Sequence, residues 1–440
     1  MKKVLIVSPH FPPINAPDMQ RVRLALPYLR GHGWEPTVLA VAPEFIEGGV
    51  CEPLLEATYP ADVRVVRVGG LRPHFTRWAG IGRLWWRCGQ ALRRAGEELL
   101  RAERFTAVLF STTQFSAFAL GPRWRAQFGV PYVVDYQDPW VSDYYARTGT
   151  RPPGGALKHG LSQWAARRQE PAVLRAASGV IAVSEAYGAM LARLYPWFDA
   201  ARVRVLPFGA AAADFEVAGR HRPAAPLVDL EDGQVHHVYT GRGGPDMHEA
   251  LTVLFRACRK FRTTHPAEAA RMKFHFIGTG YAPPPLGEDT VLPVARAEGV
   301  AEAVHEHRYR VPYFEALHYL IRAQALMAVG SNDPGYSASK IFPCLLARRP
   351  LLLIYHEQSP VLALAARMAA GQRHGFGGGA DLDTVAAAVH AQWFVGRGFA
   401  APAPFDEAAF APYSAAAMTA QLAAVLDAAA GGERSERGQP

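Results

Sequence analysis

The stretch Val4-Leu5-Ile6-Val7-Ser8-Pro9, close to the start of the chain, decides how the fold is interpreted. Four consecutive apolar residues without polar alternation are typical of a strand that is buried on both faces. The amphipathic segment 21–30 that follows has a helical stripe, which stops at Gly31. A buried strand, a loop and a helix in this order predict the first unit of a parallel sheet that helices cover on both faces.

The same pattern continues along the chain. Apolar runs separated by helix-length segments predict further strands at 37–41, 63–68, 107–111, 132–135, 179–183 and 203–207. A second series predicts strands at 235–239, 273–277, 325–329 and 351–354. We therefore predict an α/β chain with two Rossmann-like, doubly wound domains facing a cleft, because open parallel sheets bind ligands at the carboxyl ends of their strands.

Shifts in composition give the domain boundaries. The first domain is predicted over 1–210 and the second over 234–401, because residues 211–233 are rich in alanine, proline and charge and read as a linker. An alanine-rich helix is expected over 402–430. The last residues, 431–440, are expected to be disordered.

Composition excludes several classes of protein. Of the 440 residues, 50% are hydrophobic, so the chain can form large cores and is not a disordered protein. Its four cysteines are too few for a disulfide scaffold, and the histidines lack metal-ligand spacing, so we expect no metal site. No apolar run is long enough for a membrane span or a signal peptide, which indicates a cytoplasmic protein. The formal net charge of +8 favours anionic partners.

Two segments at the expected ligand edge of the first domain carry candidate binding residues. The loop 8–17 presents Asn15 and leads into a helix whose free N–H groups favour anions. Arg21, in that helix, either meets an anion or is solvated at the surface. A later strand runs out into Asp138 and Trp140. Asp138 suits a general base or a ligand of a sugar hydroxyl, with helix capping as the alternative, and Trp140 offers a flat apolar face for a sugar.

Phosphate-binding features are concentrated in the second domain. The glycine-rich turn after its first strand presents Gly241 and Arg242, and an arginine can hold a phosphate through two parallel hydrogen bonds. The segment 329–342 runs from a strand through a polar turn into a helix with Lys340 in its first turn. A cation there is unfavourable unless an anion lies beside it, so we predict a bound diphosphate, with a solvated lysine beside a serine cap as the alternative.

The segment Gly278-Thr279-Gly280 begins like a dinucleotide-binding fingerprint. Its third glycine is missing, and residues 283–285 are prolines that prevent the helix on which a pyrophosphate would rest. We interpret the segment as a structural turn and expect no nicotinamide cofactor.

Tryptophan and arginine are concentrated in residues 71–104, which include Trp78, Trp85 and Trp86. Such a segment is typical of peripheral contact with an anionic membrane, here the inner face of the plasma membrane. A surface helix whose tryptophans belong to the core explains the same residues, and both interpretations remain open. With much of the positive charge placed here, nucleic acid is not expected as a partner.

At these residues the chain resembles the retaining glycosyltransferases of the GT-B fold, in particular family 4 (glycosyl transferase group 1). Residues 3–21 look like that family's first strand, Pro-Pro loop and arginine, and 135–140 is similar to its Asp-x-Arg-Asp-x-Trp stretch, with Gln137 in place of arginine. Residues 339–350 are similar to its donor segment. Residues 405–428 look like the C-terminal helix that crosses back to the first domain.

The resemblance implies an enzyme that moves a sugar from a nucleotide-diphosphate sugar to a glycan, lipid-linked or small-molecule acceptor, with retention and without metal or other cofactor. It places Asp138, Arg242 and Lys340 in catalysis. It places the acceptor at Asn15, Arg21, Asp138 and Trp140. It places the donor at Gly241, Arg242, Arg310, Val311, Asp333, Gly335, Tyr336, Ser339 and Lys340.

An alternative function comes from a departure in the donor segment. The two glutamates that the family usually carries there correspond to Gly335 and Pro343 in this chain. Their loss favours a catalytically degenerate, sugar-nucleotide-binding partner of an active transferase. The retained Lys340, Arg242 and Asp138 favour the enzyme.

Overall fold

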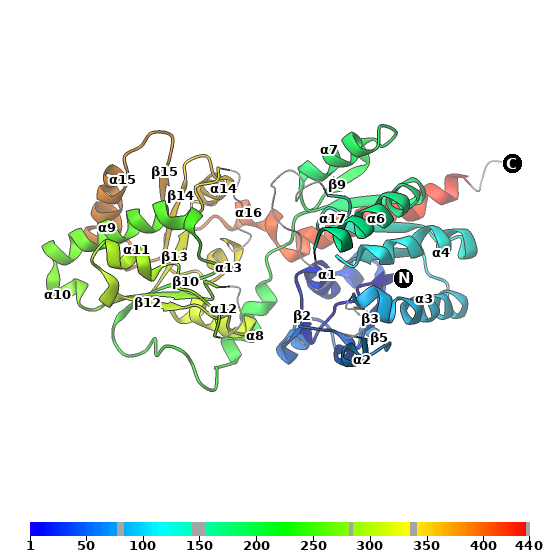
Figure 1. Ribbon diagram of the computed structural model, residues 1–440, viewed down its shortest axis with the longest axis horizontal. Coiled ribbons are helices and arrows are strands. Elements are labelled where there is room, and N and C mark those ends of the chain that lie inside the picture. Colours follow the sequence, from blue (N-terminus) through cyan, green and yellow to red (C-terminus); the bar gives the residue numbers. More distant parts are fainter. Residues whose placement is uncertain (77–82, 143–154, 281–284, 335–340, 437–440) are drawn as a thin grey trace. The chain divides into compact units, whose positions relative to one another are not determined.

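A computed structural model of the chain describes residues 1–76, 83–142, 155–280, 285–334 and 341–436 (Figure 1). The chain divides into two compact units. Unit 1 comprises Met1–Gly209 and Tyr413–Pro440, and unit 2 comprises Ala210–Pro412. Each unit has its own parallel sheet and its own hydrophobic core, as the prediction of two Rossmann-like domains requires.

In the described residues, the sheet of unit 1 has seven parallel strands in the order β5-β3-β1-β6-β7-β8-β9. They are β1 (Lys2–Val7), β3 (Trp34–Val41), β5 (Arg64–Val68), β6 (Ala107–Ser111), β7 (Tyr132–Tyr136), β8 (Gly179–Ala182) and β9 (Val203–Val205). The strands predicted for the first domain are confirmed, with ends shifted by a few residues. A separate antiparallel pair joins β2 (Ile14–Asn15) to β4 (Val50–Cys51).

Helices cover both faces of this sheet (Figure 1). On one face, α1 (Gln20–Leu29) packs against α17 (Ala415–Glu436), which also contacts β6, β7 and β8. The other face carries α3 (Leu84–Ala102), α4 (Leu120–Phe128) and α6 (Ala156–Ala176). The connections contain α2 (Pro73–Thr76), α7 (Glu185–Leu194), η1 (Pro17–Met19), η2 (Arg30–His32), η3 (Pro43–Phe45), η4 (Pro53–Thr58), η5 (Phe115–Ala119) and η6 (Ala200–Arg202).

Close packing explains why α3 carries a glycine in its middle. Trp124 of α4 is 1% exposed and stacks on Phe110 with ring centroids 5.6 Å apart. A Cβ atom at Gly96 would lie 2.4 Å from the Trp124 ring. The glycine therefore lets α3 approach α4 and complete the core beneath the sheet.

The C-terminal helix α17 belongs to unit 1 although it follows unit 2 in the chain. Asp427 on α17 forms an ion pair with Lys2 and accepts a hydrogen bond from Trp34 Nε1 at 2.9 Å. Within the range 402–430, where one helix was expected, the structure has the short α16 (Glu407–Phe410), η10 (Ala411–Tyr413) and then α17. The helix continues to Glu436, beyond the point at which we expected disorder to begin, and 437–440 lie outside the described residues.

In the described part of unit 2, six parallel strands follow the order β12-β11-β10-β13-β14-β15. They are β10 (Val235–Thr240), β11 (Met272–Ile277), β12 (Val304–His307), β13 (Ala325–Val329), β14 (Leu351–His356) and β15 (Gln372–Phe376). The four strands predicted for this domain are confirmed. The two additional strands, β12 and β15, lie at the edges of the sheet, and their polar sequences gave no apolar run to detect.

The sheet of unit 2 also has helices on both faces. On one face α9 (His248–Thr264) packs with α11 (Leu292–Ala297) and α15 (Leu382–Val389). On the other, α12 (Tyr313–Arg322) contacts β10, and α13 (Ile341–Leu346) contacts β13. Other elements of unit 2 are α10 (Pro266–Ala269), α14 (Pro360–Arg367), η7 (Pro245–Met247), η8 (Ala301–Ala303) and the π-helix η9 (His390–Val395).

The range 211–233, predicted as a linker, is part of unit 2. It contains α8 (Ala212–Arg220), which packs on α12. Tyr313 of α12 donates its hydroxyl hydrogen to the buried Asp214 Oδ2 at 2.6 Å. The backbone N–H of Leu227 bonds to the hydroxyl oxygen of Tyr319 at 2.7 Å. The apolar residues of this range were too sparse to show a helical stripe, so only the tertiary contacts identify it as structured.

Candidate functional site

The carboxyl ends of the strands in unit 1 border a cavity of about 1180 Å³. The ends of β1, β6 and β7 supply its polar wall, which includes His10, Gln114 and Asp138. Helices α3 and α6 supply an apolar wall that includes Trp85, Trp86 and Leu161. Ligands of open parallel sheets bind at this edge, so the cavity is the candidate binding site of unit 1.

Asp138 lines this cavity, as the sequence led us to expect. Asp138 is exposed to solvent. The surrounding protein nevertheless partly desolvates the carboxylate, and this effect, followed by the negative charge of Asp18, raises the pKa of Asp138 above its usual value. A carboxylate so placed can accept a hydrogen bond from a hydroxyl group in the cavity.

Trp140 reaches the same cavity but does not present an open ring face to it. The residue is 7% exposed. Its ring stacks on Phe115 with centroids 6.0 Å apart, and Phe118 meets it edge-on at 5.8 Å. The expected flat platform for a sugar is therefore covered by aromatic packing, and Trp140 forms part of the cavity wall.

Arg21 does not face a ligand, and its predicted contact with an acceptor is wrong. The side chain is fully buried. It donates hydrogen bonds from Nε to Asp135 Oδ2 at 2.6 Å and from a terminal nitrogen to the Leu206 carbonyl at 2.6 Å. The guanidinium also lies 5.0 Å from the centre of the Phe208 ring. Arg21 thus joins the segment after β9 to the end of β7, and no surface of it remains for a substrate.

Asn15 lies in the β2–β4 pair and is already engaged by the protein. Its side-chain nitrogen donates to Glu52 Oε1 at 3.1 Å. The described residues that line the cavity do not include it. The structure therefore gives Asn15 a role in fixing the loop after β1, and its predicted contact with an acceptor gains no support.

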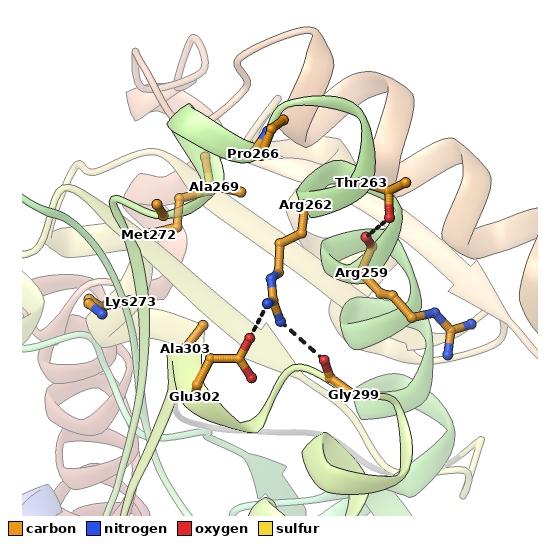
Figure 2. A pocket seen from close by; sticks show the side chains of 11 residues that line it. Arg259, Arg262, Thr263, Pro266, Ala269, Met272, Lys273, Gly299, Glu302 and Ala303 are labelled. Carbon is orange, nitrogen blue, oxygen red and sulfur yellow. Dashed lines mark hydrogen bonds and ion pairs between the residues drawn. The ribbon is translucent and has the colours of Figure 1, made fainter.

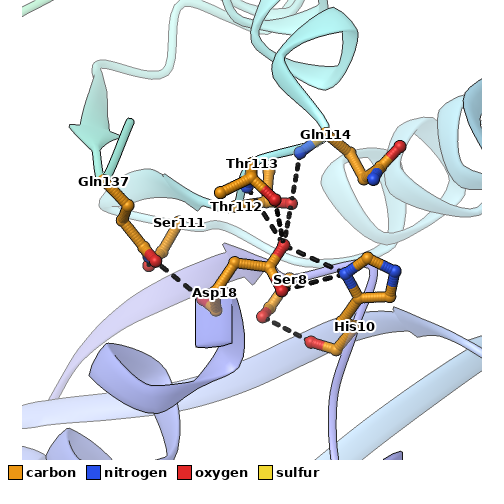
Figure 3. Close-up of polar contacts among 8 residues, drawn as sticks. All are labelled: Ser8, His10, Asp18, Ser111, Thr112, Thr113, Gln114 and Gln137. Atoms are coloured by element: carbon orange, nitrogen blue, oxygen red, sulfur yellow. Dashed lines mark hydrogen bonds and ion pairs between the residues drawn. The ribbon is translucent and has the colours of Figure 1, made fainter. Parts of the chain in front are cut away.

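A pair that the sequence analysis missed, His10 and Asp18, lies in the polar wall (Figure 3). His10 Nδ1 is 2.9 Å from Asp18 Oδ1 and 3.0 Å from Oδ2. Asp18 Oδ2 also accepts hydrogen bonds from the Thr112 hydroxyl at 2.9 Å and from the Thr113 N–H and hydroxyl at 3.0 and 3.1 Å. The sequence did contain a signal for this pair, because a histidine follows the first strand and an aspartate stands at the start of the next helical segment.

The hydrogen bonds around Asp18 decide its charge. Burial alone would raise the pKa of this 2%-exposed carboxyl group, but the hydrogen bond and charge of His10, with the bonds from Thr113 and Thr112, outweigh it and lower the pKa below its usual value. Asp18 is therefore ionised at neutral pH and acts as a fixed acceptor for His10.

In unit 2, Arg242 follows β10 as expected but is paired within the protein. Its two terminal nitrogens donate to Asp246 Oδ1 at 2.9 Å and Oδ2 at 2.6 Å. This bond, stronger than the opposing effect of desolvation, lowers the pKa of Asp246 to about 2. Gly241 is fixed by a hydrogen bond from its N–H to the Ile277 carbonyl at 2.9 Å.

The other described donor residues lie at the same edge of the sheet. The N–H of Asn332 bonds to the Asp246 carbonyl at 2.8 Å, which places the turn containing Asp333 beside the turn containing Arg242. Arg310 and Val311 follow β12, beside Gly278. The structure thus brings together Gly241, Arg242, Arg310, Val311 and Asp333 at the carboxyl ends of the strands. Gly335, Tyr336, Ser339 and Lys340 lie outside the described residues.

The interpretation of Gly278-Thr279-Gly280 as a structural turn agrees with the contacts of Glu306. This carboxylate accepts the Thr279 hydroxyl at 2.6 Å and the N–H groups of Val291 and Leu292 at 2.9 and 2.8 Å. It therefore occupies the N-terminus of α11, the nearest position at which a helix could bind a phosphate.

A second cavity, of about 580 Å³, lies at the opposite edge of the unit 2 sheet (Figure 2). It borders Met272 and Lys273 at the amino end of β11. Its most central cation, Arg262, is held by Glu302 and by the Gly299 carbonyl. The cavity contains none of the predicted donor residues, and its position at the amino ends of the strands argues against a role in donor binding.

Residues 20–209 match the family model of the glycosyl transferase 4-like domain. This match lies within unit 1. No curated protein sequence matches the chain. In unit 1, the cavity, Asp138 and the His10–Asp18 pair all lie at the edge of the sheet where the strands end, although His10 and Asp18 precede the matched residues.

Several solved structures resemble the chain over nearly its whole length. HepE from Anabaena, in complex with UDP and glucose, has 13% identity and a TM-score of 0.55, with 97% of this chain and 100% of that chain covered. Sucrose-phosphate synthase from Thermosynechococcus elongatus has 14% identity and a TM-score of 0.54, with 97% and 98% covered. Trehalose 6-phosphate synthase from Burkholderia multivorans has 12% identity and a TM-score of 0.53, with 100% and 99% covered. The fold is GT-B, with a Rossmann-like domain in each unit.

Proposed function

We propose that the protein is a glycosyltransferase that moves a sugar from a nucleotide-diphosphate sugar to a hydroxyl group of an acceptor. The observation that carries this proposal is the large cavity of unit 1, in which Asp138 and His10 share one polar wall, together with the match of residues 20–209 to the glycosyl transferase 4-like domain. The similar HepE structure, which holds UDP and glucose, supports a donor of this class.

The donor side of the proposed reaction lies in unit 2. Gly241, Arg242, Arg310, Val311 and Asp333 share the carboxyl edge of its sheet and would contact the nucleotide diphosphate. The segment with Gly335, Tyr336, Ser339 and Lys340 follows β13 in the sequence. As the diphosphate departs it gains negative charge, which arginine, lysine and backbone N–H groups can stabilise, and we propose a reaction that uses them without a metal ion. The family resemblance leads us to propose retention at the anomeric carbon.

The acceptor side lies in the cavity of unit 1, and its apolar wall favours an acceptor with a lipid part. Trp86 is 73% exposed at the start of α3, and Leu161 and Trp164 on α6 are 65% and 61% exposed. Trp85, by contrast, is partly buried against the core. We propose that the exposed set, named the apolar rim (Trp86, Leu161 and Trp164), contacts an anionic membrane at its inner face and helps a lipid-linked acceptor to reach the cavity. No helix in the described part of the chain has the length and apolar character of a membrane span.

A panel of donors and acceptors tests the proposed function. UDP-, GDP-, ADP- and dTDP-sugars are combined with free monosaccharides, sugar phosphates and octyl glucoside, and product formation and nucleotide binding are measured separately. We expect transfer with at least one pair, and an anomeric NMR signal of the product that shows retention. Binding of a nucleotide sugar without transfer to any acceptor would instead support the degenerate partner protein.

The variant Lys340→Ala tests the diphosphate assignment within the same panel. We expect the affinity for the nucleoside diphosphate to fall about tenfold or more, since a charge-assisted bond is lost. Lys260→Ala is the matched control, because Lys260 lies in α9 and is exposed. Unchanged affinity in Lys340→Ala would remove this residue from the donor site.

A further inference from the structure

Arg87 lies in the first turn of α3 and borders the unit 1 cavity. The residue is 5% exposed. One terminal nitrogen, Nη1, donates to the Phe45 carbonyl at 2.7 Å and to the Leu71 carbonyl at 3.3 Å. Nε is buried and has no hydrogen-bond partner among the described residues. The protein therefore holds the guanidinium through one nitrogen and leaves its other N–H groups without an acceptor in the part of the chain that the structure describes.

The charge of Arg87 has no counterion in the described structure. Arg21, also buried, shows how unit 1 compensates such a charge elsewhere, because it is paired with Asp135. The carboxylates among the described residues that line the cavity are Glu47 and Asp138, and neither forms an ion pair with Arg87. A buried charge that lacks a counterion is strongly unfavourable. The surroundings of Arg87 are therefore suited to a bound anion.

The N-terminus of α3 adds positive potential at the same place. The first N–H groups of a helix have no acceptor within the helix, and they give this end a partial positive charge. The N-cap residue of α3, Arg83, provides no side-chain cap, and residues 83–87 all line the cavity. Arg83 is exposed and donates to Ser162 Oγ of α6 at 2.8 Å. We call Arg83 and Arg87 the basic corner of the cavity.

The neighbours of the basic corner indicate what kind of anion it would bind. A guanidinium matches a phosphate group, to which it can donate two parallel hydrogen bonds. Asp138 lines the same cavity and suits a hydroxyl group. Trp86 and Leu161 of the apolar rim line it as well. One cavity thus offers contacts for sugar hydroxyls, for a phosphate and for an apolar chain.

We propose that the basic corner is a phosphate subsite and that the acceptor of the transferase carries a phosphate group. This inference rests on the proposed function and names its class of acceptor. The phosphate belongs either to a free sugar phosphate or to the link between a sugar and a lipid, and both present the same group to Arg87 and Arg83. It serves as a binding group, and none of its bonds changes in the reaction.

Direct binding to the full-length protein tests the subsite without requiring turnover. Two matched pairs of probes are titrated by calorimetry: glucose 6-phosphate against glucose, and geranyl phosphate against geraniol. We expect the phosphorylated member of at least one pair to bind about tenfold or more tightly than its partner, because it gains charge-assisted hydrogen bonds. Tighter binding of glucose 6-phosphate would identify a free sugar phosphate as the source, and tighter binding of geranyl phosphate a lipid-linked one.

Variants of the basic corner connect this preference to its residues. Arg87→Met removes the charge and keeps much of the length of the side chain, and it should weaken binding of the preferred phosphorylated probe about tenfold or more. Arg83→Ala should weaken it about threefold to tenfold, because Arg83 is exposed and its charge is screened. Binding of the unphosphorylated partner should stay unchanged in both. A purely structural arginine would affect both members of a pair alike.

Arg94→Ala is the matched control, because Arg94 is an exposed arginine of α3 outside the described cavity lining. Arg87→Met also removes the bonds to Phe45 and Leu71, so its melting temperature is measured beside its affinity. If it does not fold, Arg83→Ala decides the question, since an exposed side chain can be removed without disturbing the core. In transfer assays, both variants should raise KM for a phosphorylated acceptor and leave kcat close to that of the wild type.

The outcomes separate the subsite from the proposed function. Equal affinity of the wild type for both members of each pair would overturn the phosphate subsite, and so would unchanged affinity for the phosphorylated probe in Arg83→Ala and in folded Arg87→Met. Either result would leave the glycosyltransferase intact. Binding that depends on phosphate and on the basic corner, without transfer from any donor, would overturn the transferase and keep the anion site.

Discussion

Arg21 and Asp135 form an ion pair in the interior of unit 1, where both side chains are 0% exposed and Nε lies 2.6 Å from Oδ2. Asp135 Oδ2 also accepts hydrogen bonds from the Ser111 hydroxyl at 2.8 Å and from Gln137 Nε2 at 3.0 Å. The pair joins α1 to the end of β7, shortly before Asp138 in the sequence. It shapes the site from within the fold and does not contact a ligand.

Arg21→Ala should therefore destabilise unit 1 without altering its ligand contacts directly. Removing one partner of a buried ion pair leaves Asp135 as an uncompensated charge and costs about 3–5 kcal/mol. Urea unfolding followed by tryptophan fluorescence measures this, because every tryptophan except Trp393 belongs to unit 1. Arg94→Ala, at an exposed position of α3, is the control. Wild-type stability of Arg21→Ala, combined with a raised acceptor KM, would restore the binding role that the sequence suggested.

Glu170 should make the stability of unit 1 depend on pH. It is fully buried on α6 and accepts the hydroxyl hydrogens of Tyr136 and Tyr195 at 3.0 and 2.6 Å. Desolvation is the largest influence and raises its pKa to about 7. The folded state therefore holds a proton that the unfolded state has lost between about pH 4.5 and 7. Unfolding free energy should fall across this window, by about 3 kcal/mol in total from this group, and level off above pH 7.

Glu170→Gln tests this pH dependence. The neutral side chain should remove the slope and make the protein more stable than the wild type at pH 8. Glu98→Gln, at an exposed position of α3, should keep the slope. Urea titrations at several pH values measure both. A slope that persists in Glu170→Gln would assign the effect to other groups.

The Arg242–Asp246 pair should control nucleotide affinity in unit 2. Asp246 neutralises the arginine through two hydrogen bonds and, with a pKa of about 2, stays ionised at neutral pH. Under the proposed function, Asp246→Asn should strengthen UDP binding about threefold to tenfold, because the anion no longer competes with a carboxylate. Arg242→Ala should weaken it about tenfold or more. Calorimetric titration with UDP measures both changes. Arg256→Ala is the control, because Arg256 lies on α9, well after the turn that carries Arg242 in the sequence. Weaker binding in Asp246→Asn would show that the carboxylate orients the arginine for the ligand.

The apolar rim should account for membrane contact. Replacement of Trp86, Leu161 and Trp164 together by serine should reduce cosedimentation with phosphatidylglycerol vesicles about tenfold, since about 25 cal/mol is lost for each Å² of apolar surface no longer buried. The melting temperature should stay close to that of the wild type, because all three side chains are exposed. Trp197→Ser, at an exposed tryptophan of unit 1 outside the rim, is the control. Equal cosedimentation of both variants would exclude the rim as the contact.

Most of the fold could be predicted because buried parallel strands leave a local signal. The runs 4–7, 107–111 and 325–329 are apolar throughout, since helices cover both faces of each sheet. Edge strands such as β15, with the sequence Gln-Arg-His-Gly-Phe, are covered less and carry no such run. The region 211–233 was misassigned for a related reason: α8 is held by Asp214–Tyr313 and packing on α12, neither of which is visible in its own sequence.

For the candidate site, too, some features follow from the local sequence and others depend on tertiary contacts. The sequence by itself determined that Asp138 and Arg242 follow buried strands, and therefore that each lies at the ligand edge of its sheet. Only the tertiary structure decided which charges are available there. It buries Arg21 against Asp135 and pairs Arg242 with Asp246. It also places His10 Nδ1 beside Asp18, in a residue that borders the cavity. The physical reason is that the side of the sheet on which a residue lies follows from its place in a strand, whereas its charge and its free hydrogen-bonding groups depend on partners that the fold brings from elsewhere in the chain.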